Sequence, residues 1–127
     1  MIKKVAMVFG VIFVLIGILG FIPGVTTSDG HLLGIFHVNA LHNVIHLLSG
    51  LVGLYVGSTS EKNSRMYFQV FGVIYALVAI LGFVYGDSDI LTIVASNMAD
   101  TWLHVVIAVV ALYFGFASKK EAAMMAS

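Results

Sequence analysis

The sequence predicts an all-α integral membrane protein, a bundle of four transmembrane helices. Of the 127 residues, 61% are hydrophobic and only 9% are charged, whereas charged residues make up roughly a quarter of a soluble domain. The hydrophobic residues form four long runs, and a helix of about 20 residues crosses a bilayer core. Each run reaches that length with its flanks; the runs are 5–22, 44–57, 70–86 and 102–117.

The charged residues indicate how the helices are oriented. Lys and Arg favour the cytoplasmic side of a membrane protein. All six basic residues lie before the first run, between the second and third, or after the fourth, which is one side of a four-helix array: Lys3, Lys4, Lys62, Arg65, Lys119 and Lys120. The opposite side carries Asp29, Asp87, Asp89 and Asp100 and no Lys or Arg. We therefore expect both termini in the cytoplasm.

The two halves of the chain resemble each other. Segment 8–24, VFGVIFVLIGILGFIPG, is identical at 11 of 17 positions to segment 70–86, VFGVIYALVAILGFVYG. Segments 33–57 and 91–115 share 8 of 25 positions without a gap. This predicts a tandem duplication of a helical hairpin. Because each unit has two spans, the two repeats should be parallel and related by an axis along the membrane normal.

We expect a single membrane domain over residues 1–127. It divides into a first repeat of about 5–57, a cytoplasmic link 58–65, a second repeat of about 66–117 and a short tail 118–127. The outer loops contain short apolar pieces at 31–36 and 90–94. We expect these pieces to lie at the membrane interface or to fold back over the outer end of the bundle.

Small residues recur at helical spacing in all four runs, as in Gly10 with Gly17 and Gly50 with Gly53. In a membrane, helices associate through close backbone approach at small residues. The spacing predicts close packing within the chain, with self-association as the alternative. Four aromatic residues near the span ends are expected at the membrane interface, where amphipathic rings are favoured: Tyr55, Tyr67, Tyr113 and Trp102.

Polar residues gather where the second and fourth helices begin. Asn39 and Asn97 are paired by the repeat and suit N-cap positions. Asp100 follows Asn97 by three residues, the spacing of a capping box. His46 and His104 lie seven residues after these caps, about 10 Å along each helix. His42 lies on the same helix face as His46, and Asp100 lies on the same face as His104. Both faces should point into the bundle.

Three interpretations of the histidines remain open. We favour a structural hydrogen-bond network that joins them to Asn39, Asn43, Asn97 and Thr101 as well as Asp100, without a cofactor. The first alternative is a metal site at His42, His46, Asp100 and His104, since residues spaced i, i+4 share a helical face; Zn²⁺ or iron would fit, or His46 and His104 could hold a haem. The second is a proton or small-ligand pathway.

The sequence provides no set of catalytic residues. It has no cysteine, hence no disulfide or thiolate site, and no Ser/His/Asp set or paired catalytic carboxylates. Its formal net charge is zero, so nothing indicates nucleic-acid binding. We do not expect an enzyme. The expected partners are the lipid bilayer and a further membrane protein or a second copy of the chain.

The stretch LLGIFHVNALHNVIHLLSGLVGLY, with NMADTWLHVVIAVVALY in the second half, resembles a bacterial family of small four-helix membrane proteins catalogued as domain of unknown function 4383. The family pattern falls here on Asn39, His42, Asn43, His46, Asp100 and His104, with Thr101 replacing a second Asn. The resemblance implies an inner-membrane location and assigns no activity. We expect a structural or accessory subunit of a membrane complex; a metal or haem protein and a small transporter or channel are the alternatives.

Overall fold

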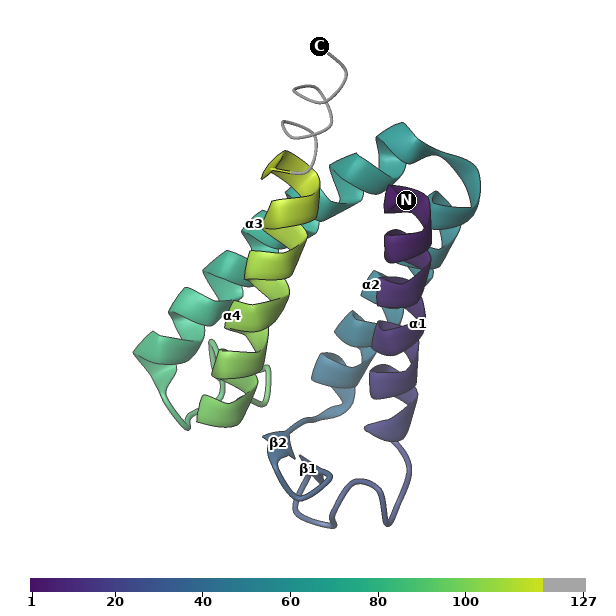
Figure 1. The fold of residues 1–127 in the computed structure, drawn as a ribbon. Coiled ribbons are helices and arrows are strands. Elements are labelled where there is room, and N and C mark those ends of the chain that lie inside the picture. Colours follow the sequence, from purple (N-terminus) through teal and green to yellow (C-terminus); the bar gives the residue numbers. More distant parts are fainter. Residues whose placement is uncertain (118–127) are drawn as a thin grey trace.

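The computed structural model describes residues 1–117 and contains four long helices (Figure 1). They are α1 (Ile2–Leu19), α2 (Ala40–Thr59), α3 (Glu61–Tyr85) and α4 (Met98–Leu112), and α4 continues as the π-helix η1 (Tyr113–Ala117). All four spans are long and apolar enough to cross a membrane. The predicted all-α architecture with four spans is therefore confirmed. The predicted tail, with Lys119 and Lys120, lies outside the described residues.

The helices form two hairpins that lie side by side, α1 with α2 and α3 with α4 (Figure 1). The N-terminus and the α2–α3 connection lie at one end of the bundle, here called the link end. The α1–α2 and α3–α4 connections lie at the other, the loop end. The predicted link 58–65 is helical except at Ser60, whose N–H donates to the Val56 carbonyl and whose hydroxyl accepts from the Asn63 N–H at 3.1 Å. One serine thus ends α2 and starts α3.

Within each hairpin the helices approach closely at glycines. A Cβ added at Gly10 would lie 2.7 Å from the carbonyl oxygen of Gly50 on α2, and one added at Gly72 would lie 2.8 Å from the Leu112 side chain on α4. Contacts this short leave no room for a side chain, which explains the small-residue pattern. The predicted packing within the chain is confirmed, whereas self-association stays a prediction.

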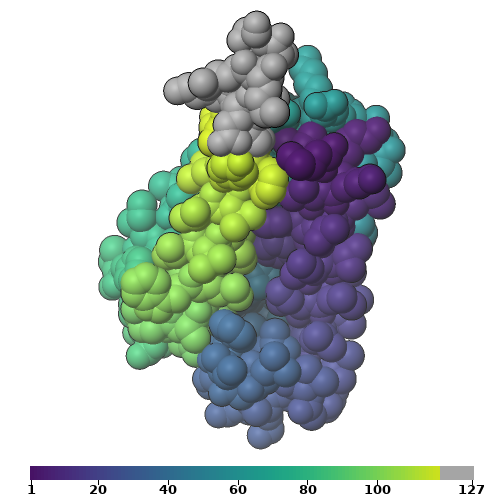
Figure 2. Space-filling view, viewed as in Figure 1, coloured from purple at the N-terminus to yellow at the C-terminus, as the bar shows by residue number. Residues whose placement is uncertain are grey.

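Aromatic side chains fill the space between the hairpins. At the link end, Phe68 packs with Tyr67 and Ala111, and Phe13 packs with Tyr75 farther toward the loop end. Figure 2 shows side chains of α1 (purple) and α4 (yellow-green) meeting along one face of this core. The interfacial position predicted for Tyr67 is wrong: the residue is 4% exposed, and its hydroxyl donates to the Ser49 carbonyl of α2 at 2.8 Å.

Both outer loops fold back over the loop end. In the first, β1 (His31–Leu32) pairs with β2 (Phe36–His37) in an antiparallel two-stranded sheet. In the second, Ile90 pairs with Val94 in a single bridge. Leu32 and Ile90 are both 5% exposed, so each loop turns an apolar side chain into the bundle. The predicted return of the loops over the bundle is confirmed.

The distribution of charge follows the two ends of the bundle. Of the described residues, the basic ones belong to the link end: Lys3, Lys4, Lys62 and Arg65. The aspartates belong to the loop end: Asp29, Asp87, Asp89 and Asp100. Between these ends the outer surface carries exposed aliphatic side chains, as expected for helices surrounded by lipid. Which end faces the cytoplasm stays a prediction.

Candidate functional site

The helices that carry the site begin at two asparagine caps. The Asn39 carboxamide oxygen accepts from the His42 N–H at 2.9 Å, and the Asn97 oxygen accepts from the Asp100 N–H at 3.0 Å. The Asp100 carboxylate accepts in return from the Asn97 N–H at 3.1 Å, which completes the predicted capping box. The predicted N-caps are therefore confirmed, and they fix where His42 and the residues after it lie.

The same asparagines join the two hairpins. The Asn39 side-chain amide donates to the Ile93 carbonyl in the second outer loop at 3.0 Å. The Asn97 amide donates to the Ile35 carbonyl in the first outer loop at 2.9 Å. Each cap therefore holds the loop of the opposite hairpin as well as its own helix, which sets the position of α2 relative to α4.

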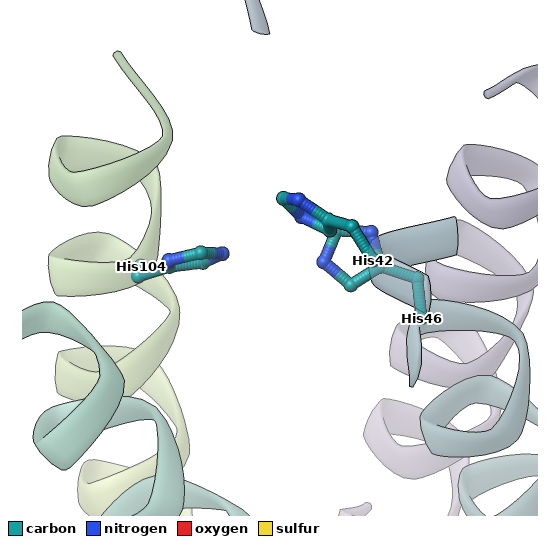
Figure 3. Close-up of side chains that lie close together, drawn as sticks. All are labelled: His42, His46 and His104. Atoms are coloured by element: carbon teal, nitrogen blue, oxygen red, sulfur yellow. The ribbon is translucent and has the colours of Figure 1, made fainter. Parts of the chain in front are cut away.

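Three histidines meet between the hairpins (Figure 3). His42 and His46 extend from α2, and His104 extends toward them from α4. One ring nitrogen from each residue lies within 4.8 Å of one from each of the other two. All three side chains are buried. The face that the sequence predicted for these residues is the one turned into the bundle, and we call the three residues the histidine cluster.

Aromatic rings support the histidine cluster from the side nearer the link end. The Phe13 ring meets the His46 ring edge to face, with centroids 5.5 Å apart. The Tyr75 ring lies 5.6 Å from the His104 ring. The His42 ring lies 4.5 Å from the ring of His46 and 5.9 Å from that of His104. Close packing on these sides limits how far the imidazoles can move.

One buried ring nitrogen of each clustered histidine lacks a hydrogen-bond partner in the part of the chain that the structure describes. These nitrogens are Nε2 of His42, Nδ1 of His46 and Nδ1 of His104. The other nitrogen of His42, Nδ1, lies 2.7 Å from the Ala95 carbonyl oxygen. Because a carbonyl can only accept, Nδ1 carries the proton, and a neutral His42 then has its lone pair on Nε2.

The hydrogen-bond network expected around the histidines forms only in part. Asn39, Asn97 and Asp100 are occupied by helix capping, and the Thr101 hydroxyl donates to the Asn97 carbonyl at 3.2 Å. None of them bonds the Nδ1 atoms of His46 and His104. Asn43 is buried beside Gly20, and its side-chain oxygen has no partner among residues 1–117. Of the four predicted metal ligands, three converge and Asp100 remains in its cap.

The two remaining histidines lie together in the first outer loop. The His31 and His37 rings stack with centroids 4.9 Å apart. Nδ1 of His31 lies 3.3 Å from Asp29, and Nδ1 of His37 lies 3.7 Å from Asp89 of the second loop. These side chains are partly exposed. They provide natural controls for the buried histidine cluster.

Two cavities adjoin the histidine cluster, and the sequence analysis predicted neither. The larger, about 350 Å³, lies between α2 and α3, and all three clustered histidines line it. The smaller, about 220 Å³, lies between α1, α4 and the first outer loop, and it reaches His46 and Asp100. Both have almost wholly apolar walls. Spacing along a helix cannot reveal such cavities, because they depend on how far the two hairpins stand apart.

Residues 3–117 match the family model described as domain of unknown function DUF4383. The chain belongs to this family. The match covers both hairpins, both caps and the histidine cluster, so the resemblance seen in the sequence is confirmed. No curated protein and no solved structure matches the chain. The family description assigns no activity.

Proposed function

We propose that this membrane protein binds a first-row transition-metal ion through His42, His46 and His104. The observation that carries the proposal is the convergence of three buried imidazoles, each with a nitrogen that has no other partner in the described chain. A buried polar group without a partner costs about 1–3 kcal/mol. Coordination of one ion would take one converging nitrogen from each ring, and imidazole suits Zn²⁺, Cu²⁺, Fe²⁺ and Ni²⁺.

The geometry requires a small contraction on binding. Ligand nitrogens of a tetrahedral Zn²⁺ site lie about 3.3 Å apart, given Zn–N bonds of about 2.0–2.1 Å, compared with separations of up to 4.8 Å in this structure. Rotation of the imidazoles and a slight approach of the hairpins would close the difference. Because His104 belongs to the opposite hairpin from His42 and His46, a bound ion would tie the hairpins together.

A contact of His42 prepares it for this role. Metal-bound histidines commonly donate their second ring N–H to a carbonyl, which fixes the tautomer and the ring orientation. The bond from His42 Nδ1 to the Ala95 carbonyl has this form. It leaves Nε2, one of the unpartnered atoms, directed away from Ala95 and available to an ion.

A haem held between His46 and His104 fits the site poorly. Their ring centroids are 6.2 Å apart, but the His42 ring lies within 6 Å of both. A porphyrin placed between the two axial ligands would occupy the space of that third imidazole. The ion therefore accounts for more of the site than the haem does.

The other predicted roles concern the surroundings of the site. We propose that the protein resides in the plasma membrane with both termini in the cytoplasm, so that the histidine cluster lies nearer the outer surface. This orientation rests on the basic residues at the link end. A role as accessory subunit of a membrane complex is compatible with a bound metal, and copurification of a partner would support it.

The direct test is metal binding by protein purified in mild detergent and stripped with a chelator. We expect one Zn²⁺ per chain, with affinity lowered at least about tenfold in each of His42→Ala, His46→Ala and His104→Ala. His37→Ala is the matched control and should bind as the wild type does. Helix content and elution volume establish that each variant is folded. Absence of Zn²⁺, Cu²⁺, Co²⁺ and Ni²⁺ binding by the wild type, or an equal loss in the control, would refute the proposal.

A further inference from the structure

The cavity between α2 and α3 has the histidine cluster at one end, and the rest of its wall is almost wholly apolar. Along α2 it extends from His42 to Val52, about 15 Å of helix. The histidine cluster lies in the half nearer the loop end, whereas Val52 and Phe71 lie toward the middle of their helices. An amphiphile in the leaflet at the loop end has the same polarity, with its head near the membrane surface and its tail toward the centre.

The mouth of this cavity opens onto the outer surface of membrane-spanning helices. Three residues of the wall also reach that surface: Leu48 is 58% exposed, Ile74 is 44% and Ile45 is 40%. Around such helices the surrounding medium is lipid hydrocarbon. A molecule that enters between α2 and α3 therefore comes from the bilayer.

We propose that this cavity binds a long-chain carboxylate from the membrane, with its chain between α2 and α3 and its head group as a further ligand of the metal ion. The inference rests on the proposed function. Three protein ligands leave a tetrahedral ion one open position, and a carboxylate is an established Zn²⁺ ligand. All three clustered histidines line this cavity, so the open position can face it. Its volume of about 350 Å³ lies in the range of small-molecule sites.

A comparison with the second cavity indicates why the carboxylate favours the first. Ile16 and His46 line it at positions that the predicted repeat pairs with Val78 and His104 of the first cavity. It is smaller, about 220 Å³, and Asp100 takes the place that His42 has in the first. A carboxylate head would meet another carboxylate there, whereas in the larger cavity it meets only imidazoles and hydroxyl groups.

The test uses Co²⁺-loaded protein, whose visible spectrum reports changes in the metal ligands, titrated with dodecanoate and separately with acetate. Val78→Trp places a large side chain in the cavity wall, and Leu77→Trp places the same side chain on the 56% exposed outer surface of α3. We expect dodecanoate to alter the spectrum of the wild type and of Leu77→Trp. Val78→Trp should need at least about tenfold more dodecanoate, with an unchanged response to acetate.

The outcomes separate this inference from the metal site. Co²⁺ binding with an equal dodecanoate response in Val78→Trp and Leu77→Trp would overturn the carboxylate site and leave the metal site intact. A dodecanoate response no stronger than that of acetate would do the same. Failure of the wild type to bind Co²⁺ or Zn²⁺ before any carboxylate is added would overturn both.

Discussion

Asn39 and Asn97 hold the two hairpins together by reciprocal hydrogen bonds. Each caps its own helix and donates its side-chain amide to a carbonyl of the opposite outer loop, at 3.0 Å for Asn39 and 2.9 Å for Asn97. The two caps also have nearly the same backbone conformation, with φ of −141° in both. The residues they bind, Ile93 and Ile35, are paired by the predicted repeat just as the asparagines are.

Replacing Asn39 tests both of its roles. Asn39→Ala removes the cap, worth about 0.5–2 kcal/mol, and the bond to Ile93, worth about 0.5–1.5 kcal/mol. Asn39→Asp retains an oxygen for the cap, loses the donor and adds a negative charge that faces the Ile93 carbonyl. We expect the free energy of unfolding in detergent to fall for both variants and to fall further for Asn39→Ala. Equal stability of Asn39→Ala and the wild type would show that the bridge contributes nothing.

Gly20 should tolerate a methyl group only if Asn43 is shortened. A Cβ at Gly20 would lie 1.9 Å from the Asn43 side-chain oxygen, although the backbone there has an ordinary φ of −63°. We expect Gly20→Ala to cost about 1–3 kcal/mol by overpacking. Measured by thermal unfolding, the double variant Gly20→Ala/Asn43→Ala should be less destabilised than the sum of the single changes. Strict additivity would contradict the contact.

The hydroxyl of Tyr67 should matter, whereas that of Tyr55 should not. Tyr67 donates to the Ser49 carbonyl inside the bundle, and Tyr55 is 69% exposed. Tyr67→Phe should lower the free energy of unfolding by about 0.5–1.5 kcal/mol. Tyr55→Phe, the matched control, should remain within about 0.5 kcal/mol of the wild type. Equal effects of the two changes would place Tyr67 at the surface after all.

The Asp29 carboxylate in the first outer loop should respond to its neighbour Thr27. The Thr27 hydroxyl donates to Asp29, and this hydrogen bond, followed by His31, holds the pKa of Asp29 below its ordinary value. A lowered folded-state pKa favours folding above the unfolded pKa, and that contribution is lost as the pH falls through the folded pKa. NMR titration of Thr27→Val should show the pKa of Asp29 raised. An unchanged pKa would exclude the hydroxyl as its cause.

The sequence predicted the parts of the fold that depend on local patterns. Hydrophobic runs indicated the four helices, and the spacing from Asn97 to Asp100 indicated the capping box. The shared face of His42 and His46 follows from helical periodicity alone. These features need no knowledge of how the hairpins meet.

The features that the sequence missed depend on the distance between elements. Tyr67 has an amphipathic ring near the end of a span, which is typical of an interfacial residue. However, α3 turns this side chain toward α2, where its hydroxyl donates to the Ser49 carbonyl. The partners expected for His46 and His104 are occupied by the caps, which only the three-dimensional arrangement shows. The duplication into two repeats and the orientation in the membrane stay predictions.

We expect three imidazoles from the two hairpins to bind one metal ion. X-ray absorption spectroscopy of the Zn²⁺-loaded protein in detergent tests it most directly. The predicted spectrum has three imidazole nitrogens at about 2.0–2.1 Å from the ion and loses one imidazole in His104→Ala, with no change in His37→Ala. A wild-type spectrum with fewer than three imidazoles, or one that His104→Ala leaves unaltered, would contradict the claim.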